Sequence, residues 1–347
     1  MEKNDLCLVT GASGYLASWL VKDLLEAGYR VRGTVRRADD SERNRTLREL
    51  LPGVELVAAD LRSPDGWDEA VDGVRWVFHV ASPQAVATEK NRTEGAVAGT
   101  EYLVRAALGS PSVRKIVLTG SVAAVAYGTD KRRYDEDDWT DLDGPAGKMD
   151  YFRSKTLAER KAWELVDDPQ ANPRGVPLAT VNPGFILGPT LVPWGRYSMQ
   201  ALQDQAEGRS PLLDMEMDAV DVRDCARMHI AVMADPAADG RRHLAMSMKA
   251  TAQEQAELIS SVTGPLGMKP VRVGLRRPAL WFAKIFMSDA GAIYDKVGRQ
   301  ITYATKYPDV YTYRYTDLRA SLQETFDRMV ELGWIGPADR DRPPAAP

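Results

Sequence analysis

The fold is indicated by one stretch near the amino terminus, Leu6-Cys-Leu-Val-Thr-Gly-Ala-Ser-Gly-Tyr-Leu-Ala17. Its first five residues are mostly apolar, which predicts a buried strand, and the pattern over residues 15–27 predicts a helix. Gly11 and Gly14 between them allow a tight turn that aims the first helix amides at an anion. Glycine-rich turns also occur where two backbone segments simply pack closely. Here a strand precedes the turn and a helix follows it, which favours a pyrophosphate-binding loop. The expected contacts come from Gly11, Ser13, Gly14, Tyr15 and Leu16.

The same alternation of strand and helix continues through the first half of the chain. Apolar runs predict further strands at residues 31–35, 54–59, 76–80, 115–119 and 178–182. Helical patterns lie between several of them, as at residues 94–107 and 151–166. Strands that are apolar on both faces and alternate with helices predict an α/β fold with a Rossmann-type, doubly wound parallel sheet.

The chain length of 347 residues predicts two units. The expected division is a nucleotide-binding domain over residues 1–188, which residues 221–246 rejoin, and a smaller, mostly helical C-terminal substrate lobe over residues 189–337. Prolines and glycines predict irregular structure over residues 190–220, and the polar, proline-rich residues 338–347 predict a flexible tail.

Composition narrows the classes of function. Lys and Arg number 45 against 49 Asp and Glu, a net charge of −4, so neither nucleic acid nor an anionic membrane is an expected partner. Cys7 and Cys225 are too few for a disulfide framework, and the three histidines lie far apart, so we expect no metal site. The chain starts without an apolar signal segment, which predicts a cytoplasmic protein. We expect it to be a monomer or homodimer that acts on a small molecule.

The end of the second predicted strand bears on the choice of dinucleotide. An acidic residue there would bind the ribose of NAD, whereas this strand ends Thr34-Val-Arg-Arg37. Guanidinium groups bind a 2′-phosphate well, so Arg36, and after it Arg37, predict NADP(H) as the cofactor. The alternative is a solvated basic turn. Asp60 and Leu61, which end the third strand, are expected beside the adenine.

Two Tyr-x-x-x-Lys pairs occur, and about half a match is expected by chance. Tyr127 and Lys131 enclose Gly-Thr-Asp and are expected in a loop, whereas Tyr151 and Lys155 lie in a helical pattern that puts both on one face. An ammonium beside a phenol stabilises the phenolate, so this second pair predicts a proton donor with its partner. Ser121 follows the fifth strand, where a hydroxyl can donate to a substrate carbonyl.

Five motifs in this order resemble one family. They are Thr10-Gly-x-x-Gly-x-x-Ala17, Phe78-His-Val-Ala-Ser-Pro83, Thr119-Gly-Ser121, Tyr151-x-x-x-Lys155 and Asn182-Pro-Gly184. Together they resemble the extended short-chain dehydrogenase/reductases, in the branch of dihydroflavonol reductases, cinnamoyl-CoA reductases and microbial aldehyde or ketone reductases.

The resemblance implies roles for the residues that match. Tyr151 would protonate a carbonyl oxygen that Ser121 orients, while Lys155 binds the ribose of the cofactor and NADPH delivers hydride. It also implies that the backbone near the cofactor comes from Val80, Ala81, Ser82, Pro183 and Gly184. Residues at the expected substrate pocket are Pro83, Ala126 and Tyr127.

The chain departs from the plant enzymes where they bind their substrates. Ala126 replaces the asparagine of dihydroflavonol reductases, and Met149-Asp-Tyr-Phe-Arg-Ser-Lys155 replaces the Asn-Trp-Tyr-Cys-Tyr-Gly-Lys of cinnamoyl-CoA reductases. We therefore expect reduction of an aldehyde or ketone with an apolar group. A 3β-hydroxysteroid dehydrogenase remains an alternative. The apolar stripe at residues 281–286 could border the large pocket that a steroid needs, or it could simply pack in the hydrophobic core. The non-enzymatic alternative is an NADP-binding redox sensor.

Overall fold

Strand β1 (Leu6–Val9) lies at the centre of a sheet that is buried on both faces. Its side chains alternate between two hydrophobic clusters, since Cys7 and Val9 pack into one and Leu6 and Leu8 into the other. This alternation explains why the whole strand is apolar. The computed structural model describes residues 1–83, 92–195, 197–210, 212–270, 274–275, 294, 296–307 and 314–336.

The main sheet has seven strands, and all its neighbouring pairs are parallel. Its order is β11-β7-β5-β4-β1-β2-β3, so the direction in which strands are added reverses between β1 and β4. At such a reversal the carboxyl ends of two strands diverge and leave a crevice in which ligands bind. The other strands are β2 (Arg30–Val35), β3 (Glu55–Ala58), β4 (Trp76–His79), β5 (Lys115–Thr119), β7 (Leu178–Pro183) and β11 (Arg242–Ala245).

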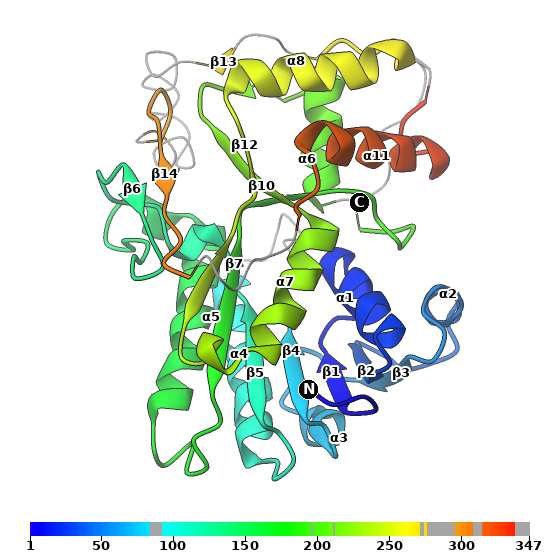
Figure 1. Cartoon of the computed structure of the whole chain (residues 1–347), viewed down its shortest axis with the longest axis vertical. Coiled ribbons are helices and arrows are strands. Elements are labelled where there is room, and N and C mark those ends of the chain that lie inside the picture. The colour runs from blue at the N-terminus through cyan, green and yellow to red at the C-terminus, as the bar shows by residue number, and fades with distance from the viewer. Residues whose placement is uncertain are drawn as a thin grey trace.

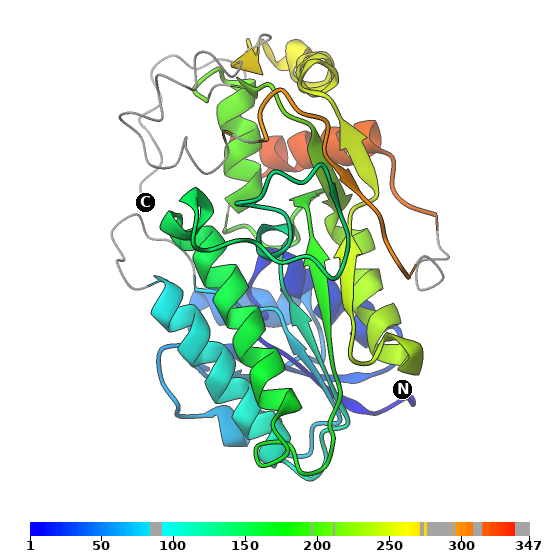
Figure 2. The ribbon, with the colours of Figure 1, turned by 90° about the vertical axis from the view of Figure 1, so that its left-hand side faces the viewer.

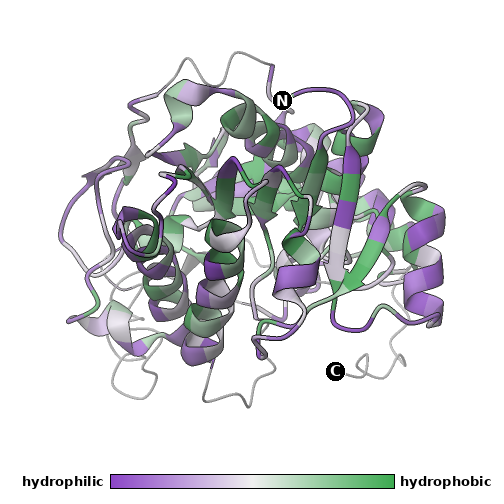
Figure 3. Ribbon diagram, turned by 90° about the horizontal axis from the view of Figure 1, so that it is seen from below, coloured by the Kyte–Doolittle hydropathy of each residue, from purple (hydrophilic) through white to green (hydrophobic). Residues whose placement is uncertain are grey.

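Helices cover both faces of this sheet, which confirms the predicted doubly wound α/β fold (Figure 1, Figure 2). One face carries α1 (Tyr15–Glu26), α2 (Glu42–Leu50) and α7 (Val222–Ala234). The other carries α3 (Trp67–Val71), α4 (Arg92–Gly109) and α5 (Asp150–Asp167). Viewed from below, hydrophobic residues concentrate on the strands between the helix layers (Figure 3).

A second group of elements lies beyond the carboxyl ends of the main strands, in the upper half of Figure 1. It contains a three-stranded sheet of β8 (Phe185–Leu187), β10 (Met217–Asp221) and β12 (Met248–Ala250). Two strand pairs join it: β9 (Leu212–Leu213) with β13 (Gly274–Leu275), and β6 (Arg133–Tyr134) with β14 (Thr302–Tyr303). Its helices are α6 (Tyr197–Ala206), α8 (Ala252–Thr263) and α11 (Leu318–Glu331).

The expectation of irregular structure over residues 190–220 is wrong for α6. Pro193 and Gly195 precede this helix and Gly208 follows it, so the breakers mark its boundaries. The predicted stripe at residues 281–286 and the predicted tail at residues 338–347 lie outside the described residues. Within the described part of the chain, no helix has the length and hydrophobicity to cross a bilayer.

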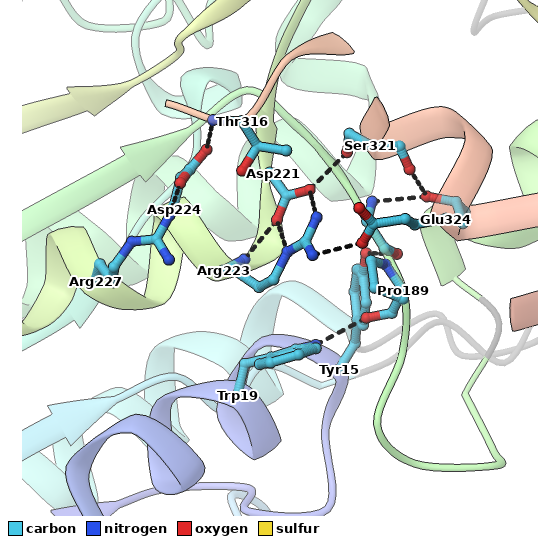
Figure 4. Close-up of polar contacts among 12 residues, drawn as sticks. Tyr15, Trp19, Pro189, Asp221, Arg223, Asp224, Arg227, Thr316, Ser321 and Glu324 are labelled. Carbon is cyan, nitrogen blue, oxygen red and sulfur yellow. Dashed lines mark hydrogen bonds and ion pairs between the residues drawn. The ribbon is translucent and has the colours of Figure 1, made fainter. Parts of the chain in front are cut away.

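Hydrogen bonds tie α1 to the segment after β8 (Figure 4). The Tyr15 hydroxyl donates to the Gly188 carbonyl at 2.5 Å, and the Trp19 indole donates to the Pro189 carbonyl at 2.8 Å. Helix α1, which starts at the glycine turn, is therefore hydrogen-bonded to the segment that follows β8 of the second group of elements.

Candidate active site

The glycine turn after β1 is shaped by backbone approaches that exclude larger side chains. Gly11 has a φ of +66°, and a Cβ atom there would lie 3.1 Å from the Cβ of Ala81. A Cβ on Gly33 of β2 would lie 2.5 Å from that of Ala12. Gly14 immediately precedes α1, and no described side chain caps that helix start. The amides of Gly11, Ala12 and Gly14 already donate within the protein, so the amides left for an anionic ligand are those of the uncapped first turn of α1.

Thr10 joins this turn to the end of β4. Its hydroxyl accepts hydrogen bonds from the amides of Val80, at 3.0 Å, and Ala81, at 2.9 Å. Ser82 and Pro83, which follow, line a small cavity described below. The structure therefore places residues 80–83 beside the glycine turn.

His79 at the end of β4 is buried, as expected for a structural histidine. Its Nδ1 lies 3.0 Å from the hydroxyl of Thr10 and its Nε2 lies 3.2 Å from that of Thr100. Burial lowers the pKa of His79 to about 3, so the ring is neutral at physiological pH.

Ser13, Tyr15 and Leu16 differ in what they offer to a ligand. Ser13 is partly exposed on the turn, whereas the side chains of Tyr15 and Leu16 are buried in the core. Because the Tyr15 hydroxyl is bonded to Gly188, only the backbone of Tyr15 faces the turn.

The basic residues after β2 gather beside the turn. Arg36 and Arg37 are exposed there. Arg43, on α2, was not singled out from the sequence: its Nη2 lies 3.4 Å from the Ser13 hydroxyl, and its guanidinium stacks over the Trp194 ring at 4.7 Å. The Trp194 indole in turn donates to the Ser13 carbonyl at 2.8 Å. No local pattern in the sequence indicates this contact, because Arg43 lies on α2 and Ser13 lies in the glycine turn.

Asp60 and Leu61 lie after β3, on the other side of Arg36. Asp60 pairs with Arg62 at 2.7 Å, and this hydrogen bond is the main cause that lowers the pKa of Asp60, with a smaller contribution from the charge of Arg36. Leu61 packs so closely on α4 that a Cβ on Gly99 would lie 2.5 Å from the Leu61 Cβ.

Ser121 and Tyr151 meet at the carboxyl end of β5. Their hydroxyl oxygens lie 3.3 Å apart, within hydrogen-bond distance, although the residues are thirty positions apart in the chain. Ser121 is buried, and its hydroxyl accepts from the Ala123 amide at 3.1 Å, whereas Tyr151 is 42% exposed. Two hydroxyls that converge at an accessible edge can both donate to one carbonyl oxygen.

Helix α5 presents Tyr151 and Lys155 one turn apart, on one face. The helix begins at Asp150, one residue before the predicted range, and its N-cap residue is Met149. Asp150 adds a negative charge to the first turn, where the helix dipole favours it.

Lys155 lies deeper than Tyr151. Burial lowers the pKa of Lys155 to about 8; the charge of Glu159 opposes this decrease, and that of Arg92 adds to it. Arg92, at the start of α4, also lies over the Tyr151 ring at 6.0 Å.

Pro183 and Gly184 end β7 next to this group. The Gly184 amide donates to the Ala245 carbonyl at 3.2 Å. A Cβ on Gly184 would lie 2.4 Å from the Asp218 carbonyl oxygen, so only glycine fits where β10 passes β7.

The residues expected at the substrate pocket differ in their burial and in their contacts. Ala126 is fully buried in a cluster with Val125 and Tyr134, so its side chain packs in the core. Tyr127 is partly buried and stacks on Phe152, the neighbour of Tyr151, with ring centres 4.1 Å apart. It therefore lies next to the paired hydroxyls.

The other Tyr-x-x-x-Lys pair, Tyr127 and Lys131, lies in a loop, as expected. Lys131 forms an ion pair with Asp138, and no helix spans Tyr127 and Lys131. Cys7 and Cys225 are both free and buried.

Comparisons with known proteins agree with this geometry. The family model described as NAD dependent epimerase/dehydratase family matches residues 7–245. Cinnamoyl-CoA reductase 1 of Arabidopsis thaliana is 39% identical over 249 residues, 70% of each chain. The bifunctional dihydroflavonol 4-reductase/flavanone 4-reductase of Malus domestica is 33% identical over 279 residues, 74% of this chain and 76% of that protein.

Among solved structures, vestitone reductase from alfalfa (Medicago sativa) superposes with a TM-score of 0.73 at 26% identity. The match covers 96% of this chain and all of that one. The chain therefore belongs to the NAD dependent epimerase/dehydratase family, the extended short-chain dehydrogenase/reductases, in the branch that contains the cinnamoyl-CoA and dihydroflavonol reductases.

Proposed function

We propose that this protein is an NADPH-dependent oxidoreductase that reduces an aldehyde or ketone to the alcohol. The observation that carries the proposal is the convergence of Ser121 and Tyr151, 3.3 Å apart, with Lys155 one helical turn below. This group lies at the carboxyl edge of the sheet, close to the glycine turn.

The residues beside the glycine turn fit a dinucleotide with a 2′-phosphate. The first turn of α1 has no side-chain cap, and Gly11 lets the glycine turn pack directly against Ala81, an arrangement that suits a pyrophosphate. Arg43 contacts Ser13 of the turn, and Arg36 and Arg37 are exposed directly after β2, so these guanidinium groups are the proposed ligands of the 2′-phosphate. Asp60 and Leu61 are the proposed adenine contacts.

NADPH, when bound, supplies the hydride for the carbonyl carbon. The Tyr151 hydroxyl donates its proton to the carbonyl oxygen, and Ser121 donates a hydrogen bond to the same oxygen. Lys155 holds the ribose and stabilises the phenolate that remains on Tyr151. The backbone of residues 80–82 and of Pro183 and Gly184 would border the nicotinamide end of the cofactor, and Pro83 and Tyr127 would border the substrate.

The neighbouring residues favour a substrate with an apolar or aromatic group. Tyr127 and Phe152 present a stacked aromatic pair beside the reacting hydroxyls. Cinnamoyl-CoA reductase 1 and the dihydroflavonol 4-reductase/flavanone 4-reductase are named for aromatic substrates, which supports this choice.

Oxidation of NADPH and of NADH in the presence of a panel of carbonyl compounds tests the proposal. The panel contains aliphatic and aromatic aldehydes, a cinnamoyl thioester, a dihydroflavonol, a diketone and a 3-ketosteroid. We expect turnover with NADPH, much less with NADH, and highest rates with aromatic carbonyls. A preference for the 3-ketosteroid would favour a 3β-hydroxysteroid dehydrogenase. Tight NADPH binding without any turnover would indicate a redox sensor.

A further inference from the structure

Glu159 is a buried carboxylate directly behind the proposed catalytic residues. It lies on α5 four residues after Lys155, on the same helix face, and it is 1% exposed. Both side chains line one small cavity of about 20 Å³ between β4, β5, α4 and α5. A buried charge is costly unless it is paired, so its partners indicate what it does.

Three groups bind this carboxylate. The Arg242 Nε of β11 donates to its Oε1 at 2.6 Å, the Asn182 Nδ2 donates to its Oε2 at 2.7 Å, and the Thr180 hydroxyl donates to Oε1 at 3.2 Å. The charge is thus neutralised by one guanidinium and oriented by two neutral side chains of β7.

The same carboxylate fixes the serine. Asn182 Nδ2 donates a second hydrogen bond, to the Ser121 carbonyl, at 3.2 Å. A Cβ on Gly120 would lie 2.8 Å from the Glu159 Oε2 and 2.4 Å from the Asn182 Nδ2, so the end of β5 rests directly on this pair. Movement of Glu159 would therefore move Ser121.

Arg242 extends the contact to the segment that follows the serine. Its Nη2 donates to the Ala124 carbonyl at 3.3 Å, and its Nη1 donates to the Glu136 carbonyl at 3.0 Å. The guanidinium also stacks over the Trp139 ring at 3.8 Å. The residues around Tyr127 are thereby attached to the same carboxylate.

The charged and titratable groups that face Lys155 come from three elements. Helix α5 contributes Glu159 and Tyr151, α4 contributes Arg92, and β4 contributes the neutral His79. Arg242 of β11 is the counter-ion of Glu159. Glu159 is thus the one carboxylate among the described groups that opposes loss of the lysine proton.

We propose that Glu159 and Arg242 are positioning residues of the reductase: the carboxylate places its negative charge one helical turn from Lys155 and holds Ser121 in place through Asn182, and the guanidinium holds the carboxylate. This proposal rests on the function proposed above, because it assigns these two residues to that reaction. Neither touches substrate or cofactor.

The Glu159→Gln substitution keeps the shape of the side chain and removes its charge. We expect the pKa of Lys155 to fall from about 8 by about one unit. The charged fraction at pH 8 would then fall from about one half to about one tenth, which predicts a roughly fivefold loss of kcat there and an alkaline limb about one unit lower. Arg242→Met leaves the carboxylate charged and should not lower the pKa of Lys155.

The lysine is followed directly by a ¹³Cε NMR titration of lysine-labelled protein, with Lys155→Arg to assign the signal. Should Glu159→Gln fold poorly, the double variant Glu159→Gln/Arg242→Met removes the unpaired guanidinium and tests the same lysine shift. Lys115→Met is the matched control, because Lys115 is an equally buried cation paired with Asp239 at the opposite end of β5.

The proposal holds if removal of the Glu159 charge lowers the Lys155 titration and the alkaline limb together, while Lys115→Met changes only stability. It is overturned if the Lys155 titration does not move, or moves equally in the Lys115 variant. Since the NMR titration requires no turnover, absence of NADPH oxidation by the wild type would contradict the proposed function separately.

Discussion

Ser121 and Tyr151 are brought together by two local features of the chain. Ser121 follows a parallel strand in extended backbone, with a φ of −168°, and Tyr151 is the second residue of α5. The carboxyl end of a strand and the amino end of the next helix lie at the same edge of a doubly wound sheet. Their hydroxyls therefore meet at the edge where a ligand enters.

Replacement of Tyr151 by Phe removes the proposed proton donor and little else. We expect kcat to fall by about 10²–10⁴-fold, the usual contribution of a general acid, with NADPH affinity retained. Steady-state kinetics and fluorescence titration with NADPH measure the two quantities. Tyr102→Phe, on the far part of α4, is the matched control and should keep full activity; equal activity in both variants would exclude Tyr151 as the proton donor.

The guanidinium of Arg43 lies close enough to the glycine turn to take part in binding a 2′-phosphate. We expect Arg43→Ala to weaken NADPH binding by about tenfold or more, the value of a charge-assisted hydrogen bond, and to leave NADH binding nearly unchanged. Isothermal titration with each dinucleotide measures this difference. Arg48→Ala, on the same helix but paired with Asp40, serves as the control. Equal losses for the two dinucleotides would contradict the assignment.

The protonation of Lys155 should limit the reaction at high pH. Its pKa is lowered to about 8 by burial, so the ammonium that stabilises the phenolate is present below that pH and is lost above it. We expect kcat for reduction to decrease as the pH rises through about 8. A pH profile that stays flat up to pH 10 would show that the charge of Lys155 does not matter.

At the scale of elements, β2 supports the glycine turn by close contact. The Gly11 amide donates to the Thr34 hydroxyl at 2.9 Å, and Gly33 leaves no room for a side chain beside Ala12. We expect Gly33→Ala to lower the free energy of unfolding by about 1–3 kcal/mol and to weaken NADPH binding. Gly109→Ala, where nothing lies within 4 Å of the added atom, should do neither. Denaturant unfolding and the same titration check both variants.

The sequence predicts elements well where one pattern decides them. The strands of the main sheet are apolar on both faces, and β1 begins at Leu6 as expected. Helix α6 was missed because breakers on both sides dominate its window, and α5 begins one residue earlier than predicted. Boundaries of this kind depend on tertiary contacts that periodicity does not contain.

Long-range contacts were beyond prediction for a different reason. Glu159 and Arg242 are 83 positions apart, and Arg43 reaches Ser13 across 30 positions. No spacing rule relates such residues, because only the strand order brings them together. The motifs around Ser121, Tyr151 and Lys155 could be recognised since each is local.

At the scale of the molecule, Asp221 connects the two groups of elements (Figure 4). This fully buried carboxylate at the end of β10 accepts two hydrogen bonds from Arg223, both at 2.8 Å, and one from Ser321 of α11 at 2.7 Å. Arg223 also pairs with Glu324, which is largely exposed.

The burial of each carboxylate should decide how much it contributes to the free energy of unfolding. We expect Asp221→Asn to lower the free energy of unfolding by about 3–5 kcal/mol, because it leaves a guanidinium without its buried partner. Glu324→Gln should lower the free energy of unfolding by at most about 1 kcal/mol, because Glu324 is exposed. Denaturant unfolding of both variants measures the contrast, and similar losses would show that Asp221 does not anchor α11.

Transfer of hydride from the cofactor to a carbonyl carbon is the central claim, and product analysis tests it most directly. The protein is incubated with NADPH deuterated at both C4 positions and an aromatic aldehyde, and the products are analysed by mass spectrometry and NMR. We expect an alcohol with a single deuterium on the carbinol carbon, and no such alcohol from Tyr151→Phe on the same time scale. An unlabelled alcohol, or no alcohol with any member of the carbonyl panel, would contradict the proposed reaction.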